Sequence, residues 1–116
     1  MDVKILTKII KFKDEYYDLI VNRSKTQTMR MPVNRINVVP GEHVVGVFPG
    51  HNDLLLRITR QGYKSFKSIN DDDAKREGFE NAEELKNVLK SIYKDYKLLD
   101  SNRFYYYQFE FIEVLK

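Results

Sequence analysis

The stretch that decides the fold is Arg103-Phe104-Tyr105-Tyr106-Tyr107-Gln108-Phe109-Glu110-Phe111-Ile112-Glu113-Val114-Leu115, near the end of the 116-residue sequence. Its side chains follow a period of two, which is typical of a β-strand, because successive residues of a strand point to opposite sides. One predicted face carries Tyr105, Tyr107, Phe109 and Phe111, and the other carries Phe104, Tyr106, Gln108, Glu110 and Ile112. We therefore predict one long aromatic strand over residues 103–115.

The remaining periodicity adds further strands and three helices. Strands are predicted over residues 3–11, 26–31, 44–48 and 54–59, and the last of these continues over residues 63–68 after a bulge or bend at Gly62. Helices are predicted over residues 13–22, from Asp71 to a stop at Gly78, and after Asn81, the last with a buried stripe of Leu85, Val88, Leu89, Ile92 and Tyr96. The order β-α-β-β-β-α-α-β predicts an α+β domain, with a small, mostly antiparallel β-barrel and flanking helices.

Composition limits the class of protein. At 116 residues, with 42% hydrophobic and 32% charged residues, the chain is expected to form one globular domain over residues 1–116. It has no cysteine, which excludes disulfides and thiolate metal sites. No apolar run approaches the ~18 residues of a membrane span, and the N-terminus lacks the apolar core of a signal peptide, so we expect a cytoplasmic protein without a membrane partner. The net charge of +3 is compatible with a polyanionic partner.

The candidate site is Lys25-Thr26-Gln27-Thr28-Met29-Arg30, where the helical period gives way to the strand period. Thr28 and Arg30 share one predicted strand face, and the junction frees Lys25 to turn toward them. An amine, a hydroxyl and a guanidinium together form a pocket for an electron-rich group such as a carbonyl, a phosphate or a base edge. The alternative is a solvated strand face with scattered polar residues.

Acidic residues and histidines could add other chemistry. The three aspartates 71–73 follow Asn70, where the helix dipole favours anions, and consecutive carboxylates splay around a helix, so a cap is expected rather than a metal site. Glu77 is either an exposed residue at a helix end or a carboxylate for the candidate site. His43 and His51 lie by predicted turns and are expected at the surface. No cofactor and no metal are therefore predicted.

The segment 22–30 resembles the signature of the ASCH domain, a glycine, lysine, threonine and arginine motif. The residues 73–79 resemble the second motif of that family, and the turn at residues 40–42 and the strand 107–112 also resemble elements of the family. The resemblance implies a PUA-like fold and a role in binding RNA. A compact branch of the family hydrolyses the acetyl amide of N4-acetylcytidine, and its lysine, threonine and glutamate fall on Lys25, Thr28 and Glu77.

The resemblance has one departure, since the glycine that the family carries two residues before the lysine falls at Arg23. A glycine in such a motif suits a positive φ angle, which strains other residues. Asn22 tolerates the left-handed conformation and is expected to take the turn in place of Arg23.

Four functions follow as alternatives. The first is a module that binds RNA or a modified nucleoside or nucleotide in a cleft formed by Lys25, Thr28, Arg30 and Glu77, with Thr26 as a further ligand-binding residue and exposed aromatic rings such as Tyr63 or Tyr106 stacking on bases. The second is an amide hydrolase with Thr28 as nucleophile, Lys25 as base and Glu77 as acid or orienting group. The third is a ribonuclease, and the fourth is a domain that binds only other proteins.

Overall fold

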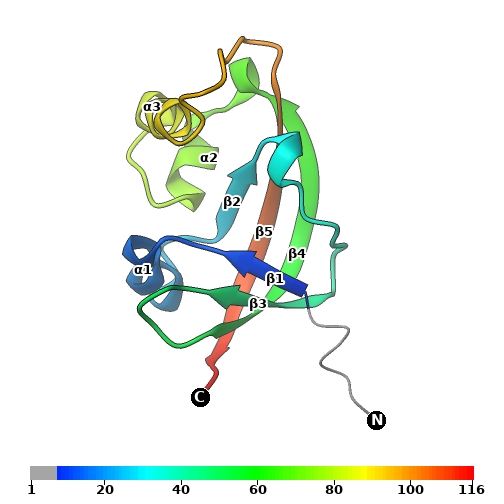
Figure 1. Ribbon diagram of the computed structural model, residues 1–116, viewed down its shortest axis with the longest axis vertical. Helices are drawn as coiled ribbons and strands as arrows, with labels where there is room; N and C mark the ends of the chain where they lie inside the picture. The colour runs from blue at the N-terminus through cyan, green and yellow to red at the C-terminus, as the bar shows by residue number, and fades with distance from the viewer. Residues whose placement is uncertain (1–7) are drawn as a thin grey trace.

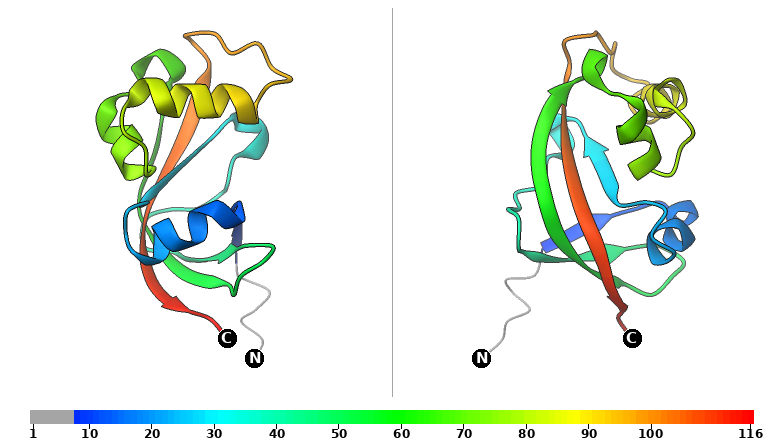
Figure 2. Two further views of the ribbon diagram at one scale, coloured as in Figure 1. Left: turned by 90° about the vertical axis from the view of Figure 1, so that its left-hand side faces the viewer. Right: turned by 180° about the vertical axis from the view of Figure 1, so that it is seen from behind.

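The computed structural model describes residues 8–116 as one five-stranded sheet with three helices beside it (Figures 1 and 2). The strands are β1 (Lys8–Lys11), β2 (Gln27–Arg30), β3 (His43–Val47), β4 (Leu54–Ser65) and β5 (Arg103–Val114). The helices are α1 (Tyr17–Val21), α2 (Asp71–Arg76) and α3 (Ala82–Ile92), with short 3-10 turns η2 (Asp14–Tyr16), η3 (Pro32–Asn34) and η4 (Phe66–Ser68). The first part of the strand expected over residues 3–11, residues 3–7, lies outside the described residues.

The strands lie in the order β1-β3-β4-β5-β2. The β1–β3 pair is parallel, and the β3–β4, β4–β5 and β2–β5 pairs are antiparallel. The long strands β4 and β5 form the spine of the molecule, with β2 on one side and β3 and β1 on the other (Figure 1). The predicted α+β class is confirmed.

The sheet is open, so the predicted barrel is not confirmed. Within residues 8–116, no strand pairing joins the edge strands β1 and β2. A barrel closes when its edge strands pair through backbone hydrogen bonds, and both edges here are only four residues long. A side chain spans the two edges instead, because Arg30 Nη2 donates to the carbonyl oxygen of Lys11 at 2.8 Å.

The aromatic alternation of β5 separates two hydrophobic clusters. Tyr107 and Phe109 pack in one cluster with Ile58 of β4. Phe104 packs in the other, against Met29 of β2 and Leu85 of α3. The two faces predicted for β5 are therefore confirmed, and the second face is the one that helices α2 and α3 cover.

The prediction of a bulge at Gly62 is wrong. Strand β4 runs unbroken through Gly62, and its pairing with β5 shifts between Leu55 and Leu56 and again between Ile58 and Arg60. A Cβ atom at residue 62 would lie 2.5 Å from the hydroxyl oxygen of Tyr106, its cross-strand neighbour. Glycine at position 62 therefore leaves room for the Tyr106 ring, and it does not mark a bend in the strand.

The caps of the two later helices are where the sequence predicts them. The Asn70 side chain accepts from the Asp73 N–H, and the Asp73 carboxylate accepts from the Asn70 N–H, which forms a reciprocal capping box. The Asn81 side chain accepts from the Glu84 N–H at 3.0 Å. Gly78 ends α2 with a φ angle of 90°.

The stripe predicted for α3 is partly wrong. Leu85 and Leu89 are buried and Val88 is half-buried, whereas Ile92 and Tyr96 are exposed. The helix ends at Ile92, so the next inward position is Tyr93, which is buried. The helix predicted over residues 13–22 is present as η2 followed by α1. Of the helices in the described part of the chain, none has the length and apolar character to cross a bilayer.

Candidate ligand-binding site

A cavity of about 200 Å³ opens at the unpaired edge of β2. Helix α1 and the end of β1 lie on one side of this edge, and α2 and α3 lie on the other (Figure 2). Its lining has a polar part, Lys11, Lys13, Tyr16, Lys25, Thr28, Arg30, Asn34 and Glu77, and an apolar part, Phe12, Met29, Phe79, Leu85, Val88, Leu89, Ile92 and Tyr93. Residues of both edge strands, Lys11 of β1 and Thr28, Met29 and Arg30 of β2, contribute to this lining.

Lys25 and Glu77 form a buried ion pair in the wall of the cavity. Their side chains are 3% and 6% exposed, and Lys25 Nζ donates to Glu77 Oε1 at 2.9 Å. The turn after α1 positions the lysine, because its backbone N–H donates to the Leu19 carbonyl. Lys25 Nζ also donates to the Gln27 carbonyl at 2.8 Å, and it lies 4.7 Å from the centre of the Tyr16 ring. Glu77 is thus part of the site and is not an exposed helix end.

Thr28 and Arg30 lie on the same face of β2, as the strand period predicts. Arg30 Nε donates to Thr28 Oγ1 at 3.2 Å, so the guanidinium holds the hydroxyl as well as the edge of β1. The guanidinium carbon of Arg30 lies 5.6 Å from the centre of the Phe12 ring. The structure therefore brings Lys25, Thr28, Arg30 and Glu77 together around one cavity.

Burial shifts the pKa values of two charged groups in the cavity wall, Glu77 and Arg30. Burial raises the pKa of Glu77 above its ordinary value, against the opposing effects of Lys25, Gln27 and Arg30. Burial also lowers the pKa of Arg30, while Tyr93, Glu77 and other groups act in the opposite direction. Both shifts have the same cause, which is the removal of charged groups from water.

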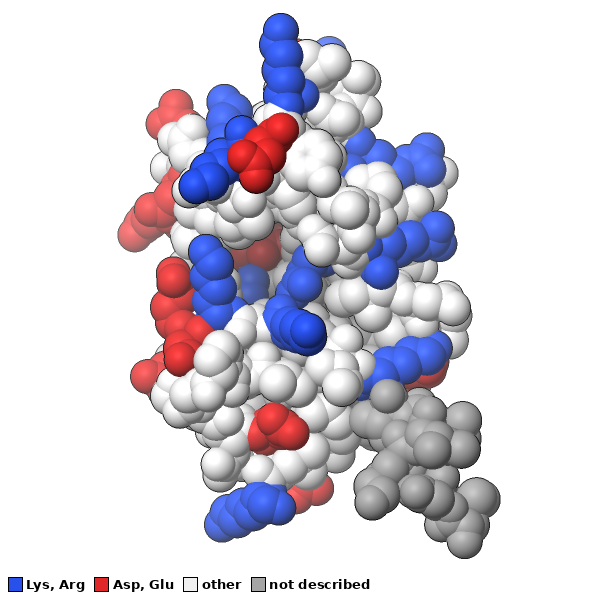
Figure 3. All heavy atoms as spheres, viewed as in Figure 1, with Lys and Arg blue, Asp and Glu red and all other residues white. Residues whose placement is uncertain are grey.

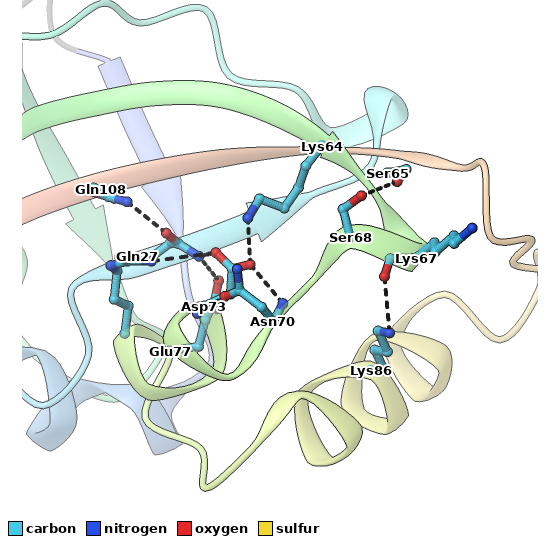
Figure 4. Close-up of polar contacts among 11 residues, drawn as sticks. Gln27, Lys64, Ser65, Lys67, Ser68, Asn70, Asp73, Glu77, Lys86 and Gln108 are labelled. Carbon is cyan, nitrogen blue, oxygen red and sulfur yellow. Dashed lines mark hydrogen bonds and ion pairs between the residues drawn. The ribbon is translucent and has the colours of Figure 1, made fainter.

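Gln27 is a buried residue of the site that sequence reasoning did not select. Its Nε2 donates to Asp73 Oδ1 at 3.2 Å and to Glu77 Oε2 at 3.3 Å, and its Oε1 accepts from Gln108 at 3.1 Å (Figure 4). Asp73 in turn accepts from Lys64 at 2.8 Å. The sequence signal for Gln27 was its position on a predicted strand face whose other residues, Met29 and Met31, are apolar.

Tyr16 is a second residue that the sequence places differently. The helical spacing of Phe12, Tyr16, Leu19 and Ile20 predicts a core residue at position 16, but the ring of Tyr16 is half-buried and lines the cavity over Lys25. Burial raises the pKa of its hydroxyl, with smaller contributions from Glu15 and Glu77. The stripe of apolar residues does not reveal this role, because periodicity gives the direction of a side chain and not the presence of a cavity.

Thr26 and the histidines lie outside the cavity lining. The backbone of Thr26 joins two segments, since its N–H donates to the Arg76 carbonyl and its carbonyl accepts from Phe109. His51 stacks on Tyr17, with ring centroids 4.2 Å apart, and His43 is exposed at the start of β3. Among residues 8–116, no three His, Asp or Glu side chains are grouped to hold a metal ion.

The turn before Lys25 differs from the sequence prediction. Arg23 itself has the positive φ angle, 69°, and Asn22 has a φ of −84°. The Arg23 side chain reaches β5, where Nη1 donates to the Phe111 carbonyl at 2.9 Å and the guanidinium carbon lies 5.4 Å from the ring centre. These contacts hold the residue in a conformation that the family glycine would adopt without strain.

The charge around the opening of the cavity is mixed, with basic groups in front. Figure 3 shows Lys and Arg side chains around a hollow on this face, with acidic surface deeper inside. Among the residues that line the cavity, Lys11 and Lys13 are exposed, and Glu77 is buried. The rim therefore attracts anions, and the interior offers both hydrogen-bond donors and a carboxylate.

The fold is that of an ASCH-type domain, as comparison with solved structures shows. The crystal structure of an ASCH domain from Lactobacillus crispatus JV V101 superimposes with a TM-score of 0.73 at 13% identity, over 90% of this chain and 79% of that one. Protein EF3133 from Enterococcus faecalis V583, a DUF984 family protein, gives 0.79 at 13% identity, over 92% and 77%. Hypothetical protein PH0355 gives 0.69 at 18% identity, over 91% and 99%. No family model and no curated protein matches the sequence.

Proposed function

We propose that the chain is an ASCH-family protein and that its cavity binds a nucleoside, nucleotide or RNA base. The observation that carries the proposal is the convergence of Lys25, Thr28, Arg30 and Glu77 on one cavity that is also lined by apolar and aromatic side chains. A nucleobase has two flat apolar faces and an edge of donors and acceptors, and it is recognised by stacking and by hydrogen bonds to that edge. The cavity presents both kinds of surface.

The polar groups of the wall keep some hydrogen-bonding capacity for a ligand. Lys25 Nζ donates two hydrogen bonds within residues 8–116, and its third N–H has no hydrogen-bond acceptor in this part of the chain. Thr28 Oγ1 accepts from Arg30, and its own proton has no acceptor in this part of the chain. Glu77 supplies the acceptor that the amino group of a base needs. A cytosine-like edge, with an amino donor beside acceptors, fits this set.

Calorimetric titration with cytidine at low salt tests the binding proposal. We expect Arg30→Lys to weaken cytidine binding about tenfold or more. Lysine lacks the planar guanidinium, whose several N–H groups can donate to Thr28 and to the ligand at the same time. The matched control is Arg60→Lys, the same change at an exposed arginine of β4 outside the cavity lining. The absence of cytidine and uridine binding by the wild-type protein would overturn the proposal.

A second candidate is hydrolysis of the N4-acetyl group, because the lysine, threonine and glutamate of that chemistry all line the cavity. Lys25 would first pass a proton to Glu77, so that its neutral amine can accept the hydroxyl proton as Thr28 Oγ1 adds to the acetyl carbonyl carbon. The amide C–N bond would then break, and the carboxyl group of Glu77 would give its proton to N4. Water would hydrolyse the acetyl ester of Thr28 and release acetate.

Incubation with N4-acetylcytidine, followed by chromatography for cytidine, tests this second candidate. We expect Thr28→Ala to abolish cytidine release, and Thr28→Ser to retain release because it keeps the hydroxyl. The absence of cytidine release by the wild-type protein would remove the hydrolase candidate and leave the binding proposal intact.

A further inference from the structure

Four side chains stack in series on the sheet face that also carries Arg30. The guanidinium carbon of Arg103 lies 4.1 Å from the centre of the Tyr63 ring, and the rings of Tyr63 and Tyr105 meet at an angle with centroids 5.8 Å apart. The guanidinium carbon of Arg35 lies 4.5 Å from the centre of the Tyr105 ring. We name this set, Arg35, Tyr63, Tyr105 and Arg103, the Tyr63 surface.

The two arginines of the Tyr63 surface carry positive charge that no acidic group balances nearby. Among residues 8–116, neither Arg35 nor Arg103 has a carboxylate within ion-pair distance, and both side chains are exposed. Arg57 of the same sheet, by contrast, pairs with Glu110 at 2.7 Å. Two exposed guanidiniums on one pair of adjoining rings make the surface positively charged, and such a surface attracts anions. Phosphate suits such arginines because it accepts paired N–H donors.

Tyr63 gives the surface a second property. Its side chain is 58% exposed, whereas Tyr105 beside it is buried. A tyrosine ring that is held from behind by an arginine and a second ring offers a fixed flat face to solvent. Stacking of bases on such exposed rings is the main sequence-independent contact of proteins that bind single-stranded nucleic acid.

The Tyr63 surface continues from the cavity across the sheet. Tyr105 of β5 is paired with Arg30 of β2 on one side and with Tyr63 of β4 on the other, so the three residues form one row across three strands. Two strand spacings place Tyr63 roughly 10 Å from Arg30 along this row. The next residue after Asn34, which lines the cavity, is Arg35. A chain with a base in the cavity could therefore reach the surface with its neighbouring nucleotide.

We propose that the Tyr63 surface binds the nucleotide next to the one whose base occupies the cavity, with its phosphate between Arg35 and Arg103 and its base stacked on Tyr63. The partner is thus a single-stranded polynucleotide rather than a free nucleoside. This inference rests on the proposed function of the cavity, and it adds a second contact area and a direction for the strand.

The test compares a ligand that fills the cavity alone with one that reaches the surface. The ligands are cytidine and fluorescein-labelled RNA and DNA hexamers of one mixed sequence, with hexamer binding followed by anisotropy over a range of salt concentrations. The variants are the double change Arg35→Gln/Arg103→Gln and the single change Tyr63→Ser. The matched double control, Arg60→Gln/Lys67→Gln, removes the same charge from two exposed residues outside both the cavity lining and the Tyr63 surface. Melting temperatures check that each variant is folded.

We expect the Arg35/Arg103 variant to bind the RNA hexamer at least tenfold more weakly than the control variant does. Its plot of log affinity against log salt should be shallower by about 0.7 for each lost phosphate contact. Tyr63→Ser should weaken hexamer binding by roughly five- to hundredfold, the effect of losing one stacked base. Cytidine affinity should be unchanged in all three variants. Equal hexamer affinities for RNA and DNA would support a surface that reads only phosphates and base faces, and a preference for RNA would support additional contacts to the ribose.

The outcomes separate this inference from the function proposed for the cavity. Intact cytidine binding, with hexamer affinities equal in the Arg35/Arg103 variant and its control, would overturn the inference alone. Hexamer binding that depends on Arg35, Arg103 and Tyr63, without any nucleoside binding, would support the surface and overturn the cavity proposal.

Discussion

Arg23 shows how one residue adapts to a turn that a glycine would suit better. It holds a φ angle of 69° next to the site lysine, and a residue other than glycine is strained there by about 1–2 kcal/mol. The contacts of its side chain with Phe111 offset part of this strain. The turn nevertheless keeps the backbone route that brings Lys25 to Glu77.

The strain at Arg23 can be measured with two variants. Arg23→Ala and Arg23→Gly both remove the guanidinium, but only glycine relieves the positive φ angle. We expect the glycine variant to be more stable than the alanine variant by about 1 kcal/mol in urea unfolding. Equal stabilities would contradict a strained turn at this residue.

The carboxyl group of Glu77 gives the site a pH dependence. Because burial raises its pKa in the folded protein above the ordinary value of 4.5, the folded state binds this proton more tightly than the unfolded chain does. The stabilisation from proton binding is fully present below the ordinary value and is lost as the pH rises through the folded pKa. A tenfold difference in proton affinity between the two states corresponds to about 1.4 kcal/mol of stability.

This prediction is checked by urea unfolding of the wild-type protein and Glu77→Gln between pH 4 and pH 8. The stability of the wild type relative to the variant should fall as the pH rises above about 4.5, because the variant has no proton to release at this position. Two parallel stability curves would mean that the pKa of Glu77 is not raised by folding.

At the scale of the elements, α2 joins a helix cap to the site. Asp73 caps the N-terminus of α2, and Glu77 follows one turn later, so both carboxylates contact the same Gln27 amide. Burial alone would raise the pKa of Asp73, but hydrogen bonds from Lys64, Asn70 and Gln27 together lower it. The stability that Asp73 contributes is therefore present above its ordinary pKa of 3.8 and is lost as the pH falls below it.

The variant Asp73→Asn tests the charge at this cap. An asparagine can still accept from the Asn70 N–H, but it loses the ion pair with Lys64 and one acceptor. We expect the variant to have a free energy of unfolding about 1–3 kcal/mol lower at pH 7, and this difference should shrink as the pH falls below the ordinary value of 3.8. Urea unfolding monitored by circular dichroism measures it. A difference that does not change with pH would assign the loss to packing instead of charge.

The helix caps and the strand faces could be predicted because their causes are local. Asn70 and Asn81 precede their helices by one residue, and the faces of β5 follow from a period of two. The burial of Glu77 could not be predicted, because it depends on Lys25 and Gln27, which lie far earlier in the chain. The end of α3 at Ile92 was missed for a related reason, since apolar spacing continued to Tyr96 beyond the helix.

At the scale of the whole molecule, the open edge of the sheet explains why a site can exist. Strands β1 and β2 do not pair within the described residues, and the cavity lies between them with the Arg30 guanidinium reaching from one to the other. The order of the elements predicted a barrel, but strand patterns alone do not show whether the last pair of edges closes. The likeness to the ASCH domain structure extends over 90% of the chain.

The central claim, a nucleoside site at this edge, is tested most directly by amide chemical-shift mapping with cytidine. We predict that saturating cytidine shifts the amide signals of residues 11–13, 25–30, 77–79 and 88–93, which surround the cavity, and that Arg30→Lys requires a higher concentration for the same shifts. Shifts confined to residues away from the cavity, or no shifts at millimolar cytidine, would contradict the claim.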